Sequence, residues 1–100
     1  MKHIRTIIAD DEPAARDRIA RSLALEADMD VVAQCRNGAE AIEAVNKHKP
    51  DLIFLDVQMP QVNGFEVVRK FEGDRAPFVV FVTAHDQYAL KAFNVNAVDF

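Results

Sequence analysis

The chain has 100 residues, of which 50% are hydrophobic and 28% are charged, a composition typical of one globular domain spanning residues 1–100. Its formal charge of −4 and its isoelectric point near 5.2 favour neither nucleic acid nor an acidic membrane surface as a direct partner. No apolar run approaches the roughly 20 residues that span a bilayer. The single cysteine, Cys35, excludes an internal disulfide, and no secretory leader follows Met1, so we expect a cytoplasmic location.

Short apolar runs rich in Ile, Val and Phe alternate along the chain with longer segments of helical period. This alternation is typical of repeated β-α units on a parallel sheet, and it predicts an α/β fold. The predicted strands are Ile4 to Ala9, Val31 to Gln34, Leu52 to Leu55, Phe78 to Val82 and Ala97 to Phe100.

Four helices are predicted between these strands. Apolar residues at helical spacing and residues suited to helix starts mark them. The first runs from Pro13 to Glu26, and the second is capped by Asn37, with Glu40 three residues on, and runs to about Lys47. The third carries Phe65, Val68 and Phe71 and ends before Gly73. The fourth is opened by His85 and Asp86 and carries Ala89 and Phe93.

Polar residues follow three of the predicted strands. Asp10, Asp11 and Glu12 come after the first strand, Asp56 after the third and Thr83 after the fourth. The carboxyl ends of parallel strands share one edge, so these residues meet there if the first and third strands are neighbours. A cluster of carboxylates is tolerated mainly when a cation neutralises it, and oxygen ligands favour Mg²⁺. We therefore expect Asp10 or Asp11, Asp56 and the backbone carbonyl of Gln58 to form a magnesium site suited to phosphate.

Each of these residues also has a plainer interpretation. Acidic residues stabilise helix N-termini, which by itself would explain Asp10 and Asp11, and an aspartate such as Asp56 is common in turns. Threonine is frequent in strands for conformational reasons alone, so Thr83 needs no function. The three histidines lack metal-ligand spacing, and we interpret them as surface or capping residues.

Three longer motifs carry a resemblance to a known family. They are Ile7-Ile8-Ala9-Asp10-Asp11-Glu12-Pro13, then Leu55-Asp56-Val57-Gln58-Met59-Pro60 with Asn63-Gly64, and then Phe81-Val82-Thr83-Ala84. Together they make the chain similar to a response-regulator receiver domain of the CheY-like superfamily, over essentially its whole length. The sequence from Thr83 to Phe93 and from Val95 to Phe100 resembles receivers of the LytTR/AlgR type, which precede a LytTR DNA-binding domain.

The resemblance implies a flavodoxin-like, doubly wound parallel sheet with strand order 2-1-3-4-5. It also implies that Asp56 accepts a phosphoryl group from a sensor histidine kinase, with Mg²⁺ held by Asp10, Asp11, Asp56 and the Gln58 carbonyl. Thr83 would donate a hydrogen bond to the phosphoryl group, and Phe100 would be the switch aromatic. The domain is then a signalling switch more than an enzyme, with at most self-phosphorylation from small donors and autodephosphorylation.

The chain departs from the family's pattern at Phe100. A receiver normally continues through the rest of its fifth strand, a lysine that contacts the phosphoryl group, and a fifth helix. The expectation is therefore a receiver truncated to about four β-α units and the start of strand five. Apolar surface exposed by a missing helix favours self-association, as a dimer or by exchange of elements.

Two other functions remain open from the sequence. The first is an interaction module that self-associates without signalling by phosphate. The second is a Mg²⁺-dependent phosphohydrolase with Asp56 as its nucleophile, although such enzymes place a second aspartate two residues after the nucleophile, where this chain has Gln58.

Overall fold

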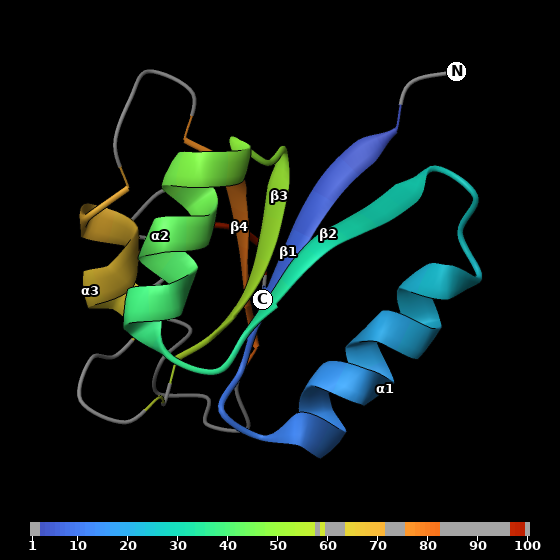
Figure 1. Cartoon of the computed structure of the whole chain (residues 1–100), viewed down its shortest axis with the longest axis horizontal. Coiled ribbons are helices and arrows are strands. Elements are labelled where there is room, and N and C mark those ends of the chain that lie inside the picture. Colours follow the sequence, from blue (N-terminus) through green and yellow to red (C-terminus); the bar gives the residue numbers. More distant parts are fainter. Residues whose placement is uncertain (1–2, 58, 60–63, 72–75, 83–96, 100) are drawn as a thin grey trace.

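The computed structural model describes residues 3–57, 59, 64–71, 76–82 and 97–99 (Figure 1). The described strands are β1 (Ile4–Ala9), β2 (Met29–Cys35), β3 (Leu52–Asp56), β4 (Phe78–Val82) and β5 (Ala97–Asp99). The described helices are α1 (Pro13–Ala24), α2 (Gly38–His48) and α3 (Gly64–Arg69).

The strands form one five-stranded sheet in the order β2-β1-β3-β4-β5, and every pair is parallel. This confirms the α/β class and the strand order that the family resemblance implied. Strand β1 lies between β2 and β3, with Ala9 opposite Cys35 on one side and Leu55 on the other. The register therefore aligns the end of β1 with the end of β3.

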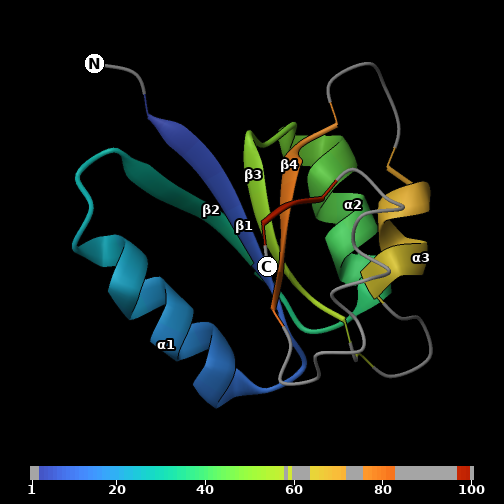
Figure 2. The same cartoon turned by 180° about the vertical axis from the view of Figure 1, so that it is seen from behind.

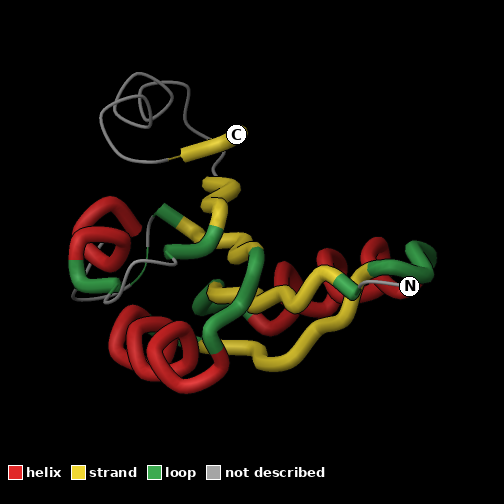
Figure 3. The backbone as a smooth tube through the Cα atoms, turned by 90° about the horizontal axis from the view of Figure 1, so that it is seen from above, coloured by secondary structure: helices red, strands yellow, loops and turns green. Residues whose placement is uncertain are grey.

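The helices lie on both faces of the sheet. Helices α2 and α3 lie together on one face, while α1 runs along the other face beside β1 and β2, as the views from the front and from above show (Figures 1 and 3). The view from behind shows the same separation (Figure 2). This two-sided covering explains why Leu52 to Leu55 is continuously apolar, since a central parallel strand is buried on both faces.

The main hydrophobic core lies between the sheet and α2 and α3. Its largest fully buried side chain is Phe81 of β4, and Cys35 belongs to it with 3% of its surface exposed. The cluster comprises Ile7, Ala9, Cys35, Ala41, Ala44, Val45, Ile53, Leu55, Val57, Met59, Val67, Val79 and Phe81. The core therefore extends directly beneath the carboxyl ends of β1 and β3.

The face that carries α1 is less completely packed. Ile8 of β1 is fully buried there, and Ala15 and Leu23 of α1 are buried as well. Between α1 and strands β3 and β4 lies a groove of about 390 Å³ whose lining includes Leu23, Phe54 and Val80.

Some predicted boundaries differ from those of the structure. Helix α1 ends at Ala24, not at Glu26 as predicted, because the amide of Glu26 turns back to the carbonyl of Leu23 (3.0 Å) and closes the last turn tightly. Strand β2 is longer than predicted, from Met29 to Cys35, because it pairs with the whole of β1. The ends of β2 are therefore set by its pairing with the full length of β1, which the local composition of the sequence does not reveal.

The helix beginning at Gly64 ends at Arg69, and Phe71 lies just beyond it, partly buried against the core. The predicted helix opened by His85 and Asp86 lies outside the described residues, as does Gly73. Strand β5 is described from Ala97 to Asp99 only. None of the helices that the structure describes has the length and apolar character needed to cross a membrane.

Candidate metal and phosphoryl site

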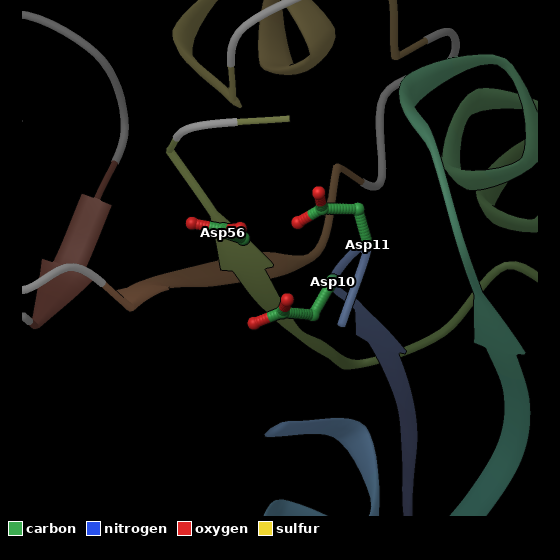
Figure 4. A group of neighbouring side chains, drawn as sticks. All are labelled: Asp10, Asp11 and Asp56. Atoms are coloured by element: carbon green, nitrogen blue, oxygen red, sulfur yellow. The ribbon is translucent and has the colours of Figure 1, made fainter. Parts of the chain in front are cut away.

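The three aspartates predicted at strand ends lie together. Asp10 follows β1 directly, Asp11 is the next residue, and Asp56 is the last residue of β3. One carboxylate oxygen from each lies within 4.8 Å of the others, and Figure 4 shows the three side chains at the adjoining ends of the two strands. The register explains the meeting, because Ala9 is paired with Leu55 and the next residues are Asp10 and Asp56.

The first aspartate is held firmly by its surroundings. Only 5% of Asp10 is exposed, and its amide continues the sheet by donating to the carbonyl of Cys35 (3.0 Å). One carboxylate oxygen, Oδ1, accepts a hydrogen bond from the amide of Glu12 (2.9 Å). This local turn fixes the carboxylate of Asp10 toward the strand ends.

The backbone that follows Asp56 in the sequence is also closely packed. Val57 is fully buried and Met59 is 6% exposed, so these two residues anchor the segment that follows Asp56 in the core. Gly64, at the start of α3, lies next to this segment, and its amide donates a hydrogen bond to the Val57 carbonyl (2.9 Å). A Cβ at Gly64 would lie 2.7 Å from the carbonyl oxygen of Asp56, so no larger residue fits without movement.

The donor set fits a hard divalent cation. All three groups are carboxylates, and their oxygens lie within 4.8 Å of one another. Two oxygens on one Mg²⁺ are at most about 4.2 Å apart, twice the usual Mg²⁺–oxygen distance, so small side-chain rotations would bring the three groups onto one ion. Asp11 is exposed and Asp56 is half-buried, so water ligands can complete the coordination from the open side. A divalent cation between the three carboxylates would offset their mutual repulsion.

Two perturbed groups lie beside the site. Burial raises the pKa of the Cys35 thiol to about 11, assisted by the negative charge of Glu40 and opposed by the positive charge of Arg16. The pKa of the partly exposed Glu40 is lowered, chiefly by the hydrogen bond from the Arg36 amide, and the positive charge of Arg16 acts in the same direction. Cys35 is therefore a protonated packing residue at neutral pH, and it is not a reactive thiolate.

The structure thus brings together Asp10, Asp11 and Asp56, while Gln58, Thr83 and Phe100 lie outside the described residues. Sequence reasoning missed one contact of this site. The Arg16 side chain donates from Nη1 to the backbone carbonyl of Asp10 (2.7 Å). The signal that could have indicated this residue is a cation in the first turn of a helix, where the helix dipole disfavours it.

Comparison with known proteins gives one consistent family. The response regulator receiver domain matches residues 6–100. An uncharacterized response regulatory protein of Shewanella oneidensis is 45% identical over 97 residues, and the transcriptional regulatory protein BtsR of Salmonella typhi is 44% identical over the same length. In both cases 97% of this chain is covered but only 41% of the relative, so the chain spans about two fifths of the length of these relatives.

Solved structures agree with this assignment. The response regulator domain of Thermotoga maritima CheB superimposes with a TM-score of 0.88 at 29% sequence identity, covering 99% of this chain and 77% of that one. The sheet order, the aspartates at the strand ends and the sequence match over residues 6–100 all point the same way. The chain therefore belongs to the response regulator receiver domain family of two-component signalling.

Proposed function

We propose that this domain is a Mg²⁺-dependent phosphoacceptor, and that Asp56 takes the phosphoryl group. The observation that carries the proposal is the meeting of three carboxylates within 4.8 Å at the carboxyl edge of the sheet. Of the three, Asp56 stands at the end of the central strand β3, on a backbone held by Val57 and Gly64. A half-buried carboxylate on a rigid support suits a nucleophile, because its position is fixed before the donor arrives.

Asp10, Asp11 and Asp56 would hold the metal ion through carboxylate oxygens, with the backbone carbonyl of Gln58 as a further ligand. Bound Mg²⁺ supplies positive charge that offsets the repulsion between these carboxylates and an incoming phosphoryl group. Asp10 contributes a carboxylate that is already oriented by the Glu12 amide. The exposed side chain of Asp11 adjusts most easily to the ion.

In the transfer step, an oxygen of the Asp56 carboxylate attacks phosphorus. The phosphorus–nitrogen bond of the kinase phosphohistidine breaks, and the histidine nitrogen leaves with the electron pair of that bond. The product is an acyl phosphate on Asp56. Thr83 is proposed to donate a hydrogen bond to a phosphoryl oxygen, and Phe100 is proposed as the aromatic residue that responds to it.

The proposed partner and output are supported by the family to which the domain belongs. Receiver domains act with sensor histidine kinases, and one relative is named as a transcriptional regulator more than twice as long as the matched segment. We propose that the longer protein containing this domain carries a LytTR-type DNA-binding domain, because the sequence from Thr83 to Phe100 resembles receivers of that class. Self-association of the receiver, as a dimer or by exchange of elements, would then pass the signal to that domain.

Intact-mass measurement after incubation with Mg²⁺ and acetyl phosphate tests the phosphoacceptor role. We expect an increase of about 80 Da, the mass of one added phosphoryl group, which disappears when Mg²⁺ is chelated. Asp56→Asn should abolish the increase. Asp17→Asn is the matched control, because Asp17 is an exposed carboxylate on α1 that pairs only with Arg21 among the described residues, and this variant should be modified as the unsubstituted chain is.

The two alternatives give different results in the same samples. A folded chain that gains no mass under any condition would favour an interaction module that does not signal by phosphate. Sustained turnover of p-nitrophenyl phosphate that depends on Asp56 would favour a phosphohydrolase. Mass gain that survives Asp56→Asn would overturn the assignment of the acceptor.

A further inference from the structure

Arg16 is tied to the site by its side chain. It is the fourth residue of α1, and long helical side chains point back toward the helix N-terminus. From there the Nη1 group donates to the carbonyl oxygen of Asp10 at 2.7 Å. The bond is charge-assisted, which makes it stronger than a bond between two neutral groups.

The carbonyl that Arg16 contacts lies just beyond the regular sheet. Asp10 is past the last residue of β1, and its amide bonds to Cys35, but its carbonyl belongs to the turn that leads into α1. Because Asp10 is 5% exposed, an unpaired carbonyl there would be costly. Arg16 supplies the donor from a side chain, and the backbone amide of Arg16 also bonds to the carbonyl of Glu12 (3.1 Å).

This carbonyl belongs to the peptide group that joins Asp10 to Asp11. Because the peptide group is planar, holding its carbonyl restrains ψ of Asp10 and φ of Asp11, the two backbone torsions between the aspartate side chains. The Glu12 amide already fixes the carboxylate of Asp10 at 2.9 Å. Arg16 therefore completes a turn in which the backbone and one carboxylate are both held.

The position of Arg16 in α1 is electrostatically unfavourable. The first turn of α1 contains no acidic residue, and a cation near a helix N-terminus opposes the helix dipole. Among the described residues no carboxylate forms an ion pair with Arg16. Its positive charge nevertheless acts on residues at the neighbouring ends of β2 and α2. It opposes the larger effect of burial, which raises the pKa of Cys35, and it adds to the effect of the Arg36 hydrogen bonds, which lower the pKa of Glu40.

We propose that Arg16 is a positioning residue of the metal site, which orients Asp10 and Asp11 by holding the carbonyl between them. The inference rests on the proposed function, since it concerns the same acidic site. It goes further by assigning a role to a residue that is not a metal ligand. Groups that orient metal ligands typically change metal affinity 10- to 100-fold when they are removed.

A purely electrostatic role for Arg16 predicts the opposite sign. If Arg16 acted only through its charge, then removing it would make the site more negative and Mg²⁺ would bind more tightly. If Arg16 acts by positioning, removing it lowers the affinity, since the aspartates lose their common orientation. The direction of the change in Mg²⁺ affinity therefore separates the two roles.

The test uses the 100-residue chain and its Arg16→Met variant, with Mg²⁺ titrated into each and followed by the backbone amide resonances of Asp11 and Glu12. We expect Arg16→Met to bind Mg²⁺ about tenfold more weakly. Arg21→Met is the matched control, because it removes the same charge from the same helix at a residue that is 80% exposed. Its Mg²⁺ affinity should match that of the unsubstituted chain.

A second measurement needs no metal. In the metal-free chain the Glu12 amide is protected by its bond to Asp10, and in Arg16→Met its hydrogen exchange should be about tenfold faster. If Arg16→Met does not fold, Arg16→Lys is tested in its place. Lysine keeps the positive charge but is shorter and lacks the planar guanidinium with its several donors, so about a threefold loss of Mg²⁺ affinity is expected.

The outcomes are distinguishable. Unchanged or tighter Mg²⁺ binding in a folded Arg16 variant overturns the positioning role and leaves the proposed function standing. Absence of Mg²⁺ binding to the unsubstituted chain overturns the proposed function, and the exchange rate of the Glu12 amide then decides by itself whether Arg16 holds the turn. Equal losses in Arg16→Met and Arg21→Met would also overturn the inference, because they would show that the loss does not depend on the contact between Arg16 and Asp10.

Discussion

Gly64 shows how one residue without a side chain supports the site. It lies at the start of α3, and its amide bonds to the carbonyl of Val57. A Cβ there would approach three backbone atoms, of which the nearest two are the Asp56 carbonyl oxygen at 2.7 Å and the Val57 Cα at 3.1 Å. Neither atom can rotate away as the end of a flexible side chain can, so the close approach depends on glycine.

Gly64→Ala should therefore destabilise the chain and disturb Asp56. We expect a loss of about 1–3 kcal/mol in the free energy of unfolding, the usual cost of overpacking a closely packed position. Urea denaturation followed by circular dichroism measures this loss. Lys70→Ala is the control, since Lys70 is exposed just after α3, and a Gly64→Ala chain as stable as this control would contradict the prediction.

At the scale of the element, α2 combines a predicted start with a packed face. The Asn37 side chain accepts a hydrogen bond from the Glu40 amide (2.9 Å), which confirms the predicted cap. The Glu40 carboxylate in turn accepts from the Arg36 amide (2.8 Å). Buried alanines and Val45 on one side of α2 then join the main core, so the helix is fixed both at its start and along its length.

Removing the cap should weaken α2 by a measurable amount. Asn37→Ala leaves the Glu40 amide without its acceptor, and we expect a loss of about 1 kcal/mol in the free energy of unfolding. Asn37→Asp keeps a side-chain oxygen at the same place and should retain the stability of the unsubstituted chain. Equal urea midpoints for the alanine and aspartate variants would show that the cap contributes nothing.

At the scale of the whole molecule, stability should depend on pH through the buried thiol. Folding raises the pKa of Cys35 from 9.0 to about 11, because burial disfavours the thiolate. The folded chain therefore keeps a proton that the unfolded chain loses. The stability tied to this group is fully present below pH 9 and is lost as pH rises toward 11.

Comparison with Cys35→Ala isolates this contribution from the lysines and the tyrosine that titrate in the same range. Free energies of unfolding are measured in urea at several pH values from 8 to 11.5. We expect the unsubstituted chain to lose more stability than the variant over the window from about 9 to about 11. Parallel curves for the two proteins would mean that the thiol is not shifted.

The sequence by itself determined most of the local structure. The apolar runs predicted the strands β1 and β4 with their observed bounds, and Asn37 predicted the start of α2. These features are local, because side-chain periodicity and capping depend on residues a few positions apart. The aspartates at the ends of the first and third strands were visible for the same reason.

Only the tertiary structure decided which of these residues meet. Strands β1 and β3 are far apart in the sequence but pair side by side in the sheet. The register that places Ala9 opposite Leu55 then brings Asp10 next to Asp56. The strand order had been expected from the family resemblance and not from any physical property of the sequence. The Arg16 contact with Asp10 and the approach of Gly64 to Asp56 likewise depend on where helices pack on the sheet, which no local pattern encodes.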